Sequence, residues 1–327
     1  MCNFVERFSS MTKRYIVLLV AIASTFLSST FRNSDKQPDK SPYKTKYAVV
    51  LVIDGPRYTE TYGDQSCKYI PRLGKELIHE GVFYADFKNN GPTYTNAGHT
   101  AITTGVYQRI SNAGKELPKN PSFFQYYLKE TGNDKSTAWL VSSKGKLEIL
   151  ANTKSKKWWN TYMPSTYCGS KGNSADYVGD LQTFNKVLEV ISYHKPKVML
   201  INFLAVDATA HQNEWEEYLQ SIQQSDEFAF QVWQAIQSDP EMKDRTALFI
   251  TNDHGRHLDG RKDGFVNHGD SCVGCRKISL LAIGPDFKRD TIVQTPGELI
   301  DISATIAELM GFSMPTTKGR VLKEMFN

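Results

Sequence analysis

The sequence has no apolar stretch long enough for an ordinary membrane-spanning helix. Its longest, residues 15–27, contains 13 residues, whereas a spanning helix needs about 20. Lys13 and Arg14 directly precede this stretch, and a short apolar run behind basic residues is typical of a secretory signal peptide. We therefore expect residues 1–29 to be a signal peptide that exports the chain to the periplasm or the cell exterior.

The start and the cleavage site of this leader stay open. Met11 is an alternative first residue, and Ala21-Ile-Ala23 and Ser28-Ser29 are two candidate cleavage positions. If cleavage occurs, we expect no stable membrane insertion of the mature chain. An uncleaved leader would instead act as an N-terminal membrane anchor.

An excess of charge is also absent once the leader is set aside. The chain carries 39 Lys and Arg against 35 Asp and Glu, and residues 1–46 account for eight of these bases and three of these acids. The remainder, with 31 bases and 32 acids, shows no basic surface for a nucleic acid. Residues 30–46 are polar and rich in Lys and Pro, which predicts a flexible linker. We find no internal repeat and expect residues 47–327 to form one domain.

Cysteine is scarce. Beyond the leader the chain has only Cys67, Cys168, Cys272 and Cys275. In an exported protein four cysteines permit two disulfides, but the sequence does not give their pairing. Cys272-Val-Gly-Cys275 could instead ligate a metal or act in redox chemistry, although a single Cys-x-x-Cys without a second pair is weak evidence for zinc. We favour a structural disulfide role.

Apolar runs and amphipathic segments alternate along the chain. Residues 47–54 are nearly all apolar and rich in β-branched side chains, which predicts a strand buried on both faces of a parallel sheet. Alternation of strands and helices predicts an α/β fold, an α/β/α sandwich with a mostly parallel central sheet. The expected strands are 47–54, 82–87, 137–142, 197–204, 246–253 and 278–283, and the expected helices are 69–80, 121–129, 178–193, 214–237 and 297–310.

Metal-ligand side chains follow several of these strands. Three aspartates and three histidines suit Zn²⁺, which accepts both carboxylate and imidazole, and open α/β sheets place ligands at the carboxyl ends of their strands. A spacing of four residues on one helix would point Asp207 and His211 at the same ion. Other histidines, namely His79, His99, His194 and His257, are expected to be ordinary core or surface residues. The candidate ligands are Asp54, Asp207, His211, Asp253, His254 and His268.

Thr95 lies in Pro92-Thr-Tyr-Thr95-Asn-Ala-Gly-His99, a turn that leads into a short helical run ending at Gly105. We expect Thr95 at or beside the helix N-terminus, where free N–H groups and the helix dipole favour an anion. A threonine hydroxyl needs a base or a metal to act as a nucleophile. The alternative is that Thr93 and Thr95 only cap the helix.

This combination resembles the alkaline phosphatase superfamily, and most closely its nucleotide pyrophosphatase/phosphodiesterase-like branch, whose nucleophile segment is Pro-Thr-x-Thr-x-x-x-His. The resemblance covers residues 47–327 and implies an alkaline-phosphatase-like catalytic domain with two Zn²⁺ ions, other divalent metals being an alternative. It assigns one ion to Asp207, His211 and His268 and the other to Asp54, Asp253 and His254, with the oxygen of Thr95 bridging toward the second.

The same resemblance suggests groups that hold the phosphoryl oxygens. Arg109-Ile-Ser-Asn112 is similar to a Gly-Ile-x-x-Asn segment whose Asn donates to such an oxygen, although the Gly is absent here. Lys144-Gly-Lys146 resembles a Lys-x-Arg pair that binds the dianion of a phosphate monoester. Lys146 lacks the bidentate fork of an arginine, and the alternative is that both lysines are solvated surface residues.

These features predict a hydrolase that cleaves phosphate monoesters, diesters or pyrophosphates through a phosphothreonine on Thr95. The substrate would be a small phosphate ester, and the sequence does not indicate the oligomeric state. The Cys/Ser-x-Pro-x-Arg motif of sulfatases is missing at Thr95, which argues against sulfate hydrolysis as the main activity. Two alternatives remain: an exported phosphoryl-headgroup transferase, and a non-catalytic relative that binds metal or phosphate.

Overall fold

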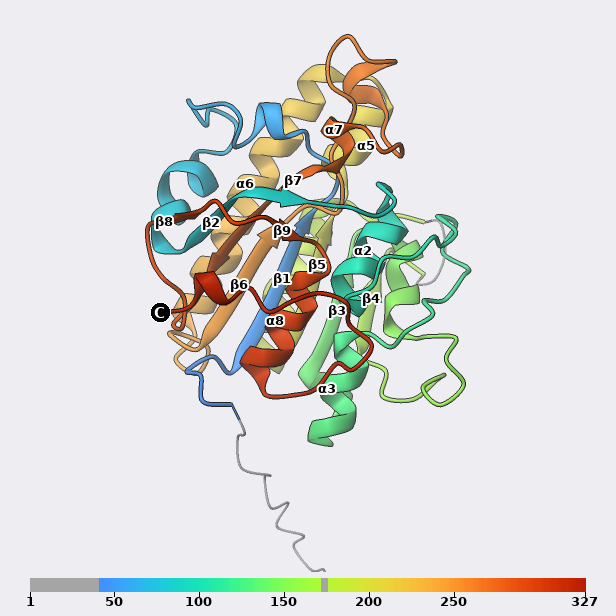
Figure 1. Ribbon diagram of the computed structural model, residues 1–327, viewed down its shortest axis with the longest axis vertical. Coiled ribbons are helices and arrows are strands. Elements are labelled where there is room, and N and C mark those ends of the chain that lie inside the picture. Colours follow the sequence, from blue (N-terminus) through green and yellow to red (C-terminus); the bar gives the residue numbers. More distant parts are fainter. Residues whose placement is uncertain (1–40, 172–175) are drawn as a thin grey trace, which may run out of the picture. The chain divides into compact units, whose positions relative to one another are not determined.

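A computed structural model describes residues 41–171 and 176–327 (Figure 1). The predicted signal peptide, and the part of the predicted linker up to residue 40, lie outside the described residues. Among the helices that the structure describes, none has the length and apolar character needed to cross a membrane.

The centre of the structure is a nine-stranded sheet in the order β4-β3-β5-β1-β6-β7-β2-β8, with β9 also paired to β2. β1 runs parallel to both β5 and β6, and only β7 is antiparallel to its neighbours β6 and β2. The predicted mostly parallel sheet is therefore confirmed. The strands are β1 (Tyr47–Ile53), β2 (Val82–Lys88), β3 (Ala138–Ser142), β4 (Ser165–Cys168), β5 (Val198–Phe203), β6 (Thr246–Thr251), β7 (Lys277–Ile283), β8 (Thr291–Val293) and β9 (Gly297–Glu298).

Helices cover both faces of this sheet and complete the α/β/α sandwich. In Figure 1 the helices α2, α3 and α8 lie over the face that is turned to the viewer. The helices are α2 (Thr95–Thr104), α3 (Phe123–Thr131), α4 (Asp180–His194), α5 (Ala205–His211), α6 (Trp215–Ser238), α7 (Val273–Arg276) and α8 (Asp301–Met310).

The side chains of the central strand β1 explain why helices pack on both faces of the sheet. All seven residues of β1 are buried, and because successive side chains point to opposite faces, β1 feeds two cores. Val50 and Val52 pack with side chains of α2, α3 and α8, whereas Val49 and Leu51 pack with side chains of α4, α5 and α6. A strand that is apolar at every position fits only such a middle layer.

The expected elements differ from the observed ones in a few places. The segment predicted as one helix over 69–80 forms a π-helical turn, Arg72–Glu76, followed by a 3₁₀ turn, Leu77–Glu80. The carboxylate of Asp226 accepts hydrogen bonds from the backbone N–H groups of Arg72 and Leu73 at 2.9 and 2.8 Å. It so satisfies two donors at the start of the π-helical turn. The last helix begins at Asp301 rather than 297, because Gly297–Glu298 is strand β9.

The disulfide role that we favoured is wrong for this structure, since all four described cysteines are unbridged. Cys168 belongs to the core on one face of the sheet and Cys67 packs against the core on the other, so the sheet separates them. Cys272 is the N-cap of the single-turn helix α7 and Cys275 lies within it, and the sulfur of Cys272 accepts the N–H of Cys275 at 3.4 Å.

Candidate metal centre and active site

The sheet brings the six predicted ligands to one edge. Asp54 follows β1 directly, Asp207 and His211 lie on α5 just after β5, and Asp253 and His254 follow β6. Because β5, β1 and β6 are adjacent and parallel, their carboxyl ends meet at the same edge. The sixth residue, His268, reaches this edge from the segment that connects β6 with β7.

Asp207, His211 and His268 form one compact group. Oδ1 of Asp207 lies 3.2 Å from Nε2 of His211 and 3.3 Å from Nε2 of His268, and the two imidazole nitrogens are 3.1 Å apart. Nδ1 of His268 donates to the carbonyl oxygen of Thr93 at 2.8 Å, which turns its Nε2 toward the group. This convergence of two imidazoles on a carboxylate suits a divalent ion.

Asp54, Asp253 and His254 form a second group, and its ligand atoms have no hydrogen-bond partner among the described residues. These atoms are Oδ1 of Asp54, Oδ2 of Asp253 and Nε2 of His254, and all three are buried. Nε2 of His254 lies 3.6 Å from the Asp54 oxygen and 3.3 Å from the Asp253 oxygen. Buried polar atoms left unpaired are costly, whereas a bound cation would satisfy all three at once, so these residues fit a metal.

The surroundings shift the pKa values of Asp54 and Asp207 in opposite directions. Burial and the nearby Asp253 carboxylate raise the pKa of Asp54, against the effect of Lys144. Burial also acts to raise the pKa of Asp207, but Lys144 and hydrogen bonds from His211 and His268 outweigh it and hold that pKa well below its usual range. Burial lowers the pKa of His254, which favours the neutral imidazole that a metal requires.

Thr95 is the first residue of α2, with 1% of its surface exposed. The capping interpretation is wrong: Tyr94 holds the N-cap position, and the hydroxyl of Thr93 donates to the carbonyl oxygen of Asp270 at 2.6 Å. Oγ1 of Thr95 instead accepts from Nζ of Lys144 at 3.3 Å. The threonine hydroxyl therefore faces the two groups of ligand-type side chains.

Lys144 and Lys146 are not surface residues, so that alternative is wrong. Lys144 is 3% exposed, and its Nζ lies 2.7 Å from Oδ2 of Asp207 and 2.9 Å from Oδ2 of Asp54. Although burial opposes it, the pKa of Lys144 is raised by these carboxylates. Lys146 is 8% exposed, and burial together with the charge of Lys144 lowers the pKa of Lys146 to about 8.

Asn112 lies beside the N-terminus of α2 but is exposed. Its Oδ1 accepts the backbone N–H of Asn96 at 3.0 Å, so it caps the helix one residue after Thr95. This contact uses the oxygen of the Asn112 amide, whose nitrogen is a potential donor.

Three further residues belong to this site, and sequence reasoning missed them. His99, which we expected to be an ordinary histidine, is fully buried; its Nδ1 donates to the Thr95 carbonyl at 2.9 Å and lies 3.3 Å from Oδ2 of Asp253. Asn202 donates to Oδ2 of Asp54 at 3.1 Å. Arg256 is fully buried and donates to Oδ1 of Asp207 at 2.6 Å. Two signals pointed to His99: it lies four residues after Thr95 on a helix, and it ends the Pro-Thr-x-Thr-x-x-x-His segment.

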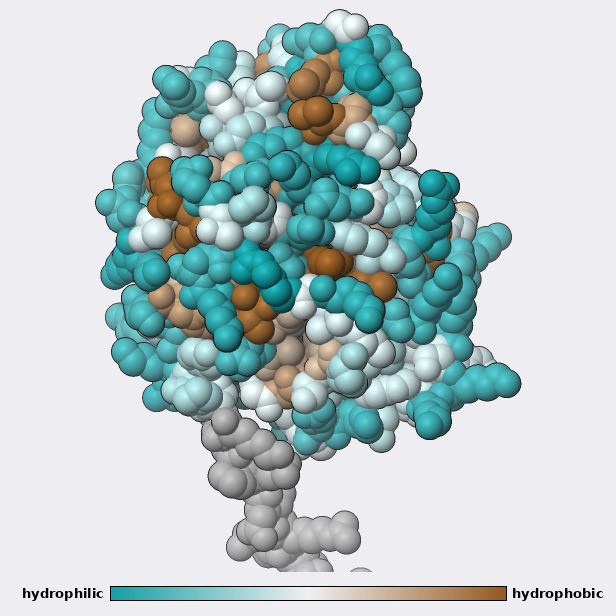
Figure 2. All heavy atoms as spheres, viewed as in Figure 1, coloured by the Kyte–Doolittle hydropathy of each residue, from teal (hydrophilic) through white to brown (hydrophobic). Residues whose placement is uncertain are grey.

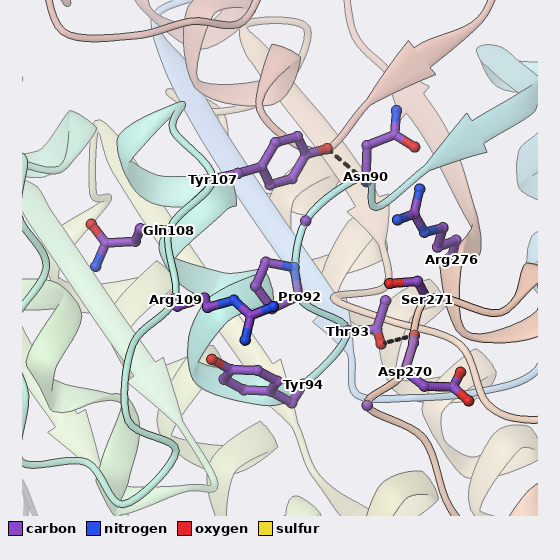
Figure 3. A pocket seen from close by; sticks show the side chains of 12 residues that line it. Asn90, Pro92, Thr93, Tyr94, Tyr107, Gln108, Arg109, Asp270, Ser271 and Arg276 are labelled. Carbon is purple, nitrogen blue, oxygen red and sulfur yellow. Dashed lines mark hydrogen bonds between the residues drawn. The ribbon is translucent and has the colours of Figure 1, made fainter.

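A cavity of about 370 Å³ lies next to the Thr95 segment (Figure 3). Thr93, Tyr94, Arg109, Asp270 and Arg276 are among the residues that line it. None of the six predicted ligands lines this cavity. It therefore flanks the nucleophile segment rather than containing the metal groups.

The face of the molecule in Figure 2 is mainly hydrophilic, with apolar residues in small scattered groups.

Comparisons with known proteins agree with this architecture. The family model named Metalloenzyme superfamily matches residues 150–314, a range that holds five of the six ligand-type residues. GPI ethanolamine phosphate transferase 1 from Mus musculus is 23% identical over 310 residues, which cover 86% of this chain and 33% of that protein. The chain thus spans about a third of the length of this curated relative.

Two solved structures show the shared fold. An alkaline phosphatase superfamily protein from Vibrio parahaemolyticus has a TM-score of 0.62 at 17% identity, with 89% of this chain and 72% of that chain covered. A phosphonate monoester hydrolase from Silicibacter pomeroyi has a TM-score of 0.60 at 12% identity, with 85% and 76% covered. These matches confirm the predicted fold. They do not single out the nucleotide pyrophosphatase/phosphodiesterase-like branch, which stays a prediction.

Proposed function

Because the chain belongs to the metalloenzyme superfamily, we propose that it is a metal-dependent phosphohydrolase whose nucleophile is Thr95. The observation that carries this proposal is the set of three buried, unpaired ligand atoms of Asp54, Asp253 and His254. They lie at the edge of the sheet where Thr95 begins a helix. A threonine facing such a set is what phosphoryl transfer to a protein hydroxyl requires.

The ligand chemistry supports two divalent ions, and zinc fits best. Asp207, His211 and His268 would hold one, and Asp54, Asp253 and His254 would hold the other with Thr95 beside it. Imidazole and carboxylate together are ligands that Zn²⁺ accepts. When bound, such ions would activate the attacking oxygen and neutralise charge on the leaving oxygen of an in-line displacement.

The residues of the chain position the reacting groups. The oxygen of Thr95 attacks phosphorus, the bond from phosphorus to the ester oxygen breaks, and water then hydrolyses the phosphothreonine. Lys144 already contacts the Thr95 oxygen at 3.3 Å, so a phosphoryl group on Thr95 would meet its ammonium group. Lys146 and the amide nitrogen of Asn112 would hold the remaining oxygens, where negative charge builds up. His99 fixes the first turn of α2 through the Thr95 carbonyl.

Replacement of Thr95 tests the nucleophile. Thr95→Ala should abolish turnover of an aryl phosphate while the bound zinc, measured by mass spectrometry, stays at the wild-type level. Thr95→Ser keeps a hydroxyl and should retain part of the activity. Full activity of Thr95→Ala would overturn the assignment.

The preferred substrate depends on Lys144. A buried ammonium beside Thr95 favours the dianion of a monoester, whereas a diester carries one negative charge less. We propose to compare an aryl phosphate monoester with the matching bis-aryl diester in zinc-loaded wild type and Lys144→Ala. A monoester preference that collapses in the variant would identify a phosphatase. A diester preference that is indifferent to Lys144 would identify a phosphodiesterase.

A second candidate function is transfer of a phosphoryl headgroup. The match over 86% of this chain to GPI ethanolamine phosphate transferase 1 favours it. The first step would be unchanged, but an alcohol instead of water would accept the group from Thr95. Adding increasing amounts of an alcohol to the aryl ester assay separates the two: a transferase forms the new phosphate ester, and a hydrolase releases inorganic phosphate. For either activity we propose an exported location, as the predicted signal peptide implies.

A further inference from the structure

A second kind of ligand cluster lies in the segment between β6 and β7. Ligand atoms of His257, Asp270, Cys272 and Cys275 all lie within 4.8 Å of one another. His257 and Cys275 are buried, with 2% and 0% of their surface exposed, and the other two are half-buried. None of the four belongs to the proposed phosphohydrolase site, so the cluster needs an explanation of its own.

The imidazole of His257 is oriented toward this cluster and lacks a partner there. Its Nδ1 lies 2.9 Å from Oδ1 of Asp263, an arrangement in which Nδ1–H donates to the carboxylate and leaves a lone pair on Nε2. Among the residues that the structure describes, nothing hydrogen-bonds to this buried Nε2. A carboxylate that orients the far nitrogen of a histidine is the usual outer contact of a metal-bound imidazole.

A carboxylate oxygen of the cluster, itself an acceptor, lies close to that Nε2. Oδ2 of Asp270 lies 3.4 Å from Nε2 of His257. Two lone pairs that face each other repel unless a cation lies between them. A metal ion would turn both atoms into ligands and remove the repulsion.

The two cysteines supply the remaining ligands. Cys272 and Cys275 are unbridged; Cys272 is the N-cap of α7 and Cys275 lies within its single turn, and their sulfurs lie within 4.8 Å of each other. The backbone N–H of Cys275 donates to Sγ of Cys272 at 3.4 Å, and such a bond stabilises a thiolate. Thiolate sulfur together with imidazole selects Zn²⁺ over Mg²⁺ or Ca²⁺.

Charge in the surroundings matches this ligand set. Two thiolates and one carboxylate would carry three negative charges against two positive charges of a divalent ion. Arg261 and Lys262 both contact Oδ2 of Asp270, at 3.0 and 2.9 Å, and offset the excess. The two basic side chains are half-exposed and can adjust when a metal takes one lone pair of this oxygen.

We propose that His257, Asp270, Cys272 and Cys275 bind a structural Zn²⁺ ion. Four protein ligands close a tetrahedral site and leave no open position for a substrate or water, which is the pattern of structural rather than catalytic zinc. The proposal does not rest on the proposed phosphohydrolase function.

This ion would fix the segment that carries His268. The carbonyl of Asp270 accepts the Thr93 hydroxyl at 2.6 Å, and the carbonyl of Thr93 accepts Nδ1 of His268 at 2.8 Å. Figure 3 shows the first of these contacts at the wall of the cavity. A metal that holds Asp270 therefore orders the nucleophile segment and the ligand His268 together.

Cobalt gives a test that is specific to sulfur ligands. The purified full chain, kept reduced and stripped of metal, is titrated with Co²⁺ alone and its absorption is recorded. We expect an intense thiolate-to-cobalt charge-transfer band in the near ultraviolet, which is lost when Zn²⁺ in excess over all three proposed sites replaces the cobalt. Because the proposed phosphohydrolase ligands include no sulfur, that site cannot produce the band, and loss of activity and loss of the band are separate results.

Three variants complete the test. Cys272→Ser and Cys275→Ser should lose the band and bind one zinc less than wild type, while Cys67→Ser, which removes a cysteine outside the cluster, should keep both. Absence of the band in the reduced wild-type protein would overturn the proposal without any variant having to fold. So would a Cys272–Cys275 disulfide, detected by mass in protein purified with zinc and without reductant.

Discussion

Nζ of Lys144 lies 2.7 Å from Oδ2 of Asp207, inside the group of acidic side chains that we propose to hold metal. The same nitrogen is 2.9 Å from Oδ2 of Asp54, so one ammonium group serves two buried carboxylates. In the absence of a metal, this lysine is the cation that contacts both of them among the described residues. Its removal should therefore have different consequences in metal-free and metal-loaded protein.

We expect Lys144→Met to destabilise the metal-free protein by about 3–5 kcal/mol, because loss of one partner leaves buried carboxylates unpaired. Zinc should reduce this loss, since it supplies positive charge at the same place. Urea unfolding with and without zinc measures both values. Lys154→Met is the matched control: Lys154 pairs with Glu116 at 3.0 Å on the surface, and its loss should cost about 0–1 kcal/mol. Equal destabilisation of Lys144→Met with and without zinc would contradict the prediction.

Gly98→Ala should displace the nucleophile helix. A Cβ at this position would lie 2.5 Å from the carbonyl oxygen of Asp253. Helix propensity alone would favour alanine by about 1 kcal/mol, but overpacking of about 1–3 kcal/mol should outweigh it. We expect kcat/KM for an aryl phosphate to fall about 100-fold, because Thr95 moves relative to the ligands. Gly179→Ala meets no atom within 4 Å and should leave kcat/KM unchanged; activity close to wild type in Gly98→Ala would show that the helix tolerates the methyl group.

Asn112 should have two separable roles. Asn112→Ala removes the acceptor for the Asn96 N–H and should cost about 0.5–2 kcal/mol, as loss of a helix cap does, together with activity. Asn112→Asp keeps the acceptor but replaces the amide donor by a carboxylate. It should therefore be nearly as stable as wild type while kcat/KM falls about 10²–10³-fold, the usual effect of losing one donor to a developing charge. If Asn112→Asp keeps full activity, Asn112 is only a cap.

Asp226 lies on the face of the sheet opposite α2. It should make the free energy of unfolding depend on pH. Burial raises the pKa of Asp226 to about 6, above the value of about 3.9 for an unfolded chain. The folded state therefore binds this proton more tightly, and stability should decrease by about 3 kcal/mol as the pH rises from about 4 to 6. In Asp226→Asn this decrease should be absent, as measured by urea unfolding across that range.

Glu227 provides the control for this pH dependence. It lies next to Asp226 but on the surface, and hydrogen bonds from Gln231 and Arg72 lower the pKa of Glu227. Its contribution therefore has the opposite sign, since it is lost as the pH falls through the lowered pKa. Glu227→Gln should keep the decrease between about pH 4 and 6. An identical pH slope in wild type and Asp226→Asn would rule out Asp226 as its source.

The sequence predicts the parts of the site that are tied to strand ends. Asp54 and Asp253 each follow an apolar run, so their place at one edge followed from the parallel sheet, and the spacing of Asp207 and His211 follows from helix geometry. Strands β8 and β9 could not be predicted, because three or two residues are too few to show an alternation.

The buried positions of four side chains could not be predicted from the sequence. His99 and His257 are single histidines without a repeating pattern, and their neighbours in space come from other parts of the chain. Arg256 follows two predicted ligands, but only the folded path of the 255–276 segment turns it toward Asp207. The burial of Lys144 likewise depends on Asp54 and Asp207, which are distant in sequence. Tertiary contacts decide the positions of all four side chains, and local sequence patterns do not encode such contacts.

The order of the central strands has a consequence for the order of folding events. Gly55 donates to Asp253 across 198 residues of sequence, and Asn202 donates to Asp54 across 148. Closing such long loops is slow and costs chain entropy before any contact repays it. The metal groups at this edge therefore cannot assemble until β1, β5 and β6 have paired. Metal binding at this edge should therefore indicate that the sheet has formed. A nascent chain that has not yet emerged beyond β6 should be unable to bind the metal.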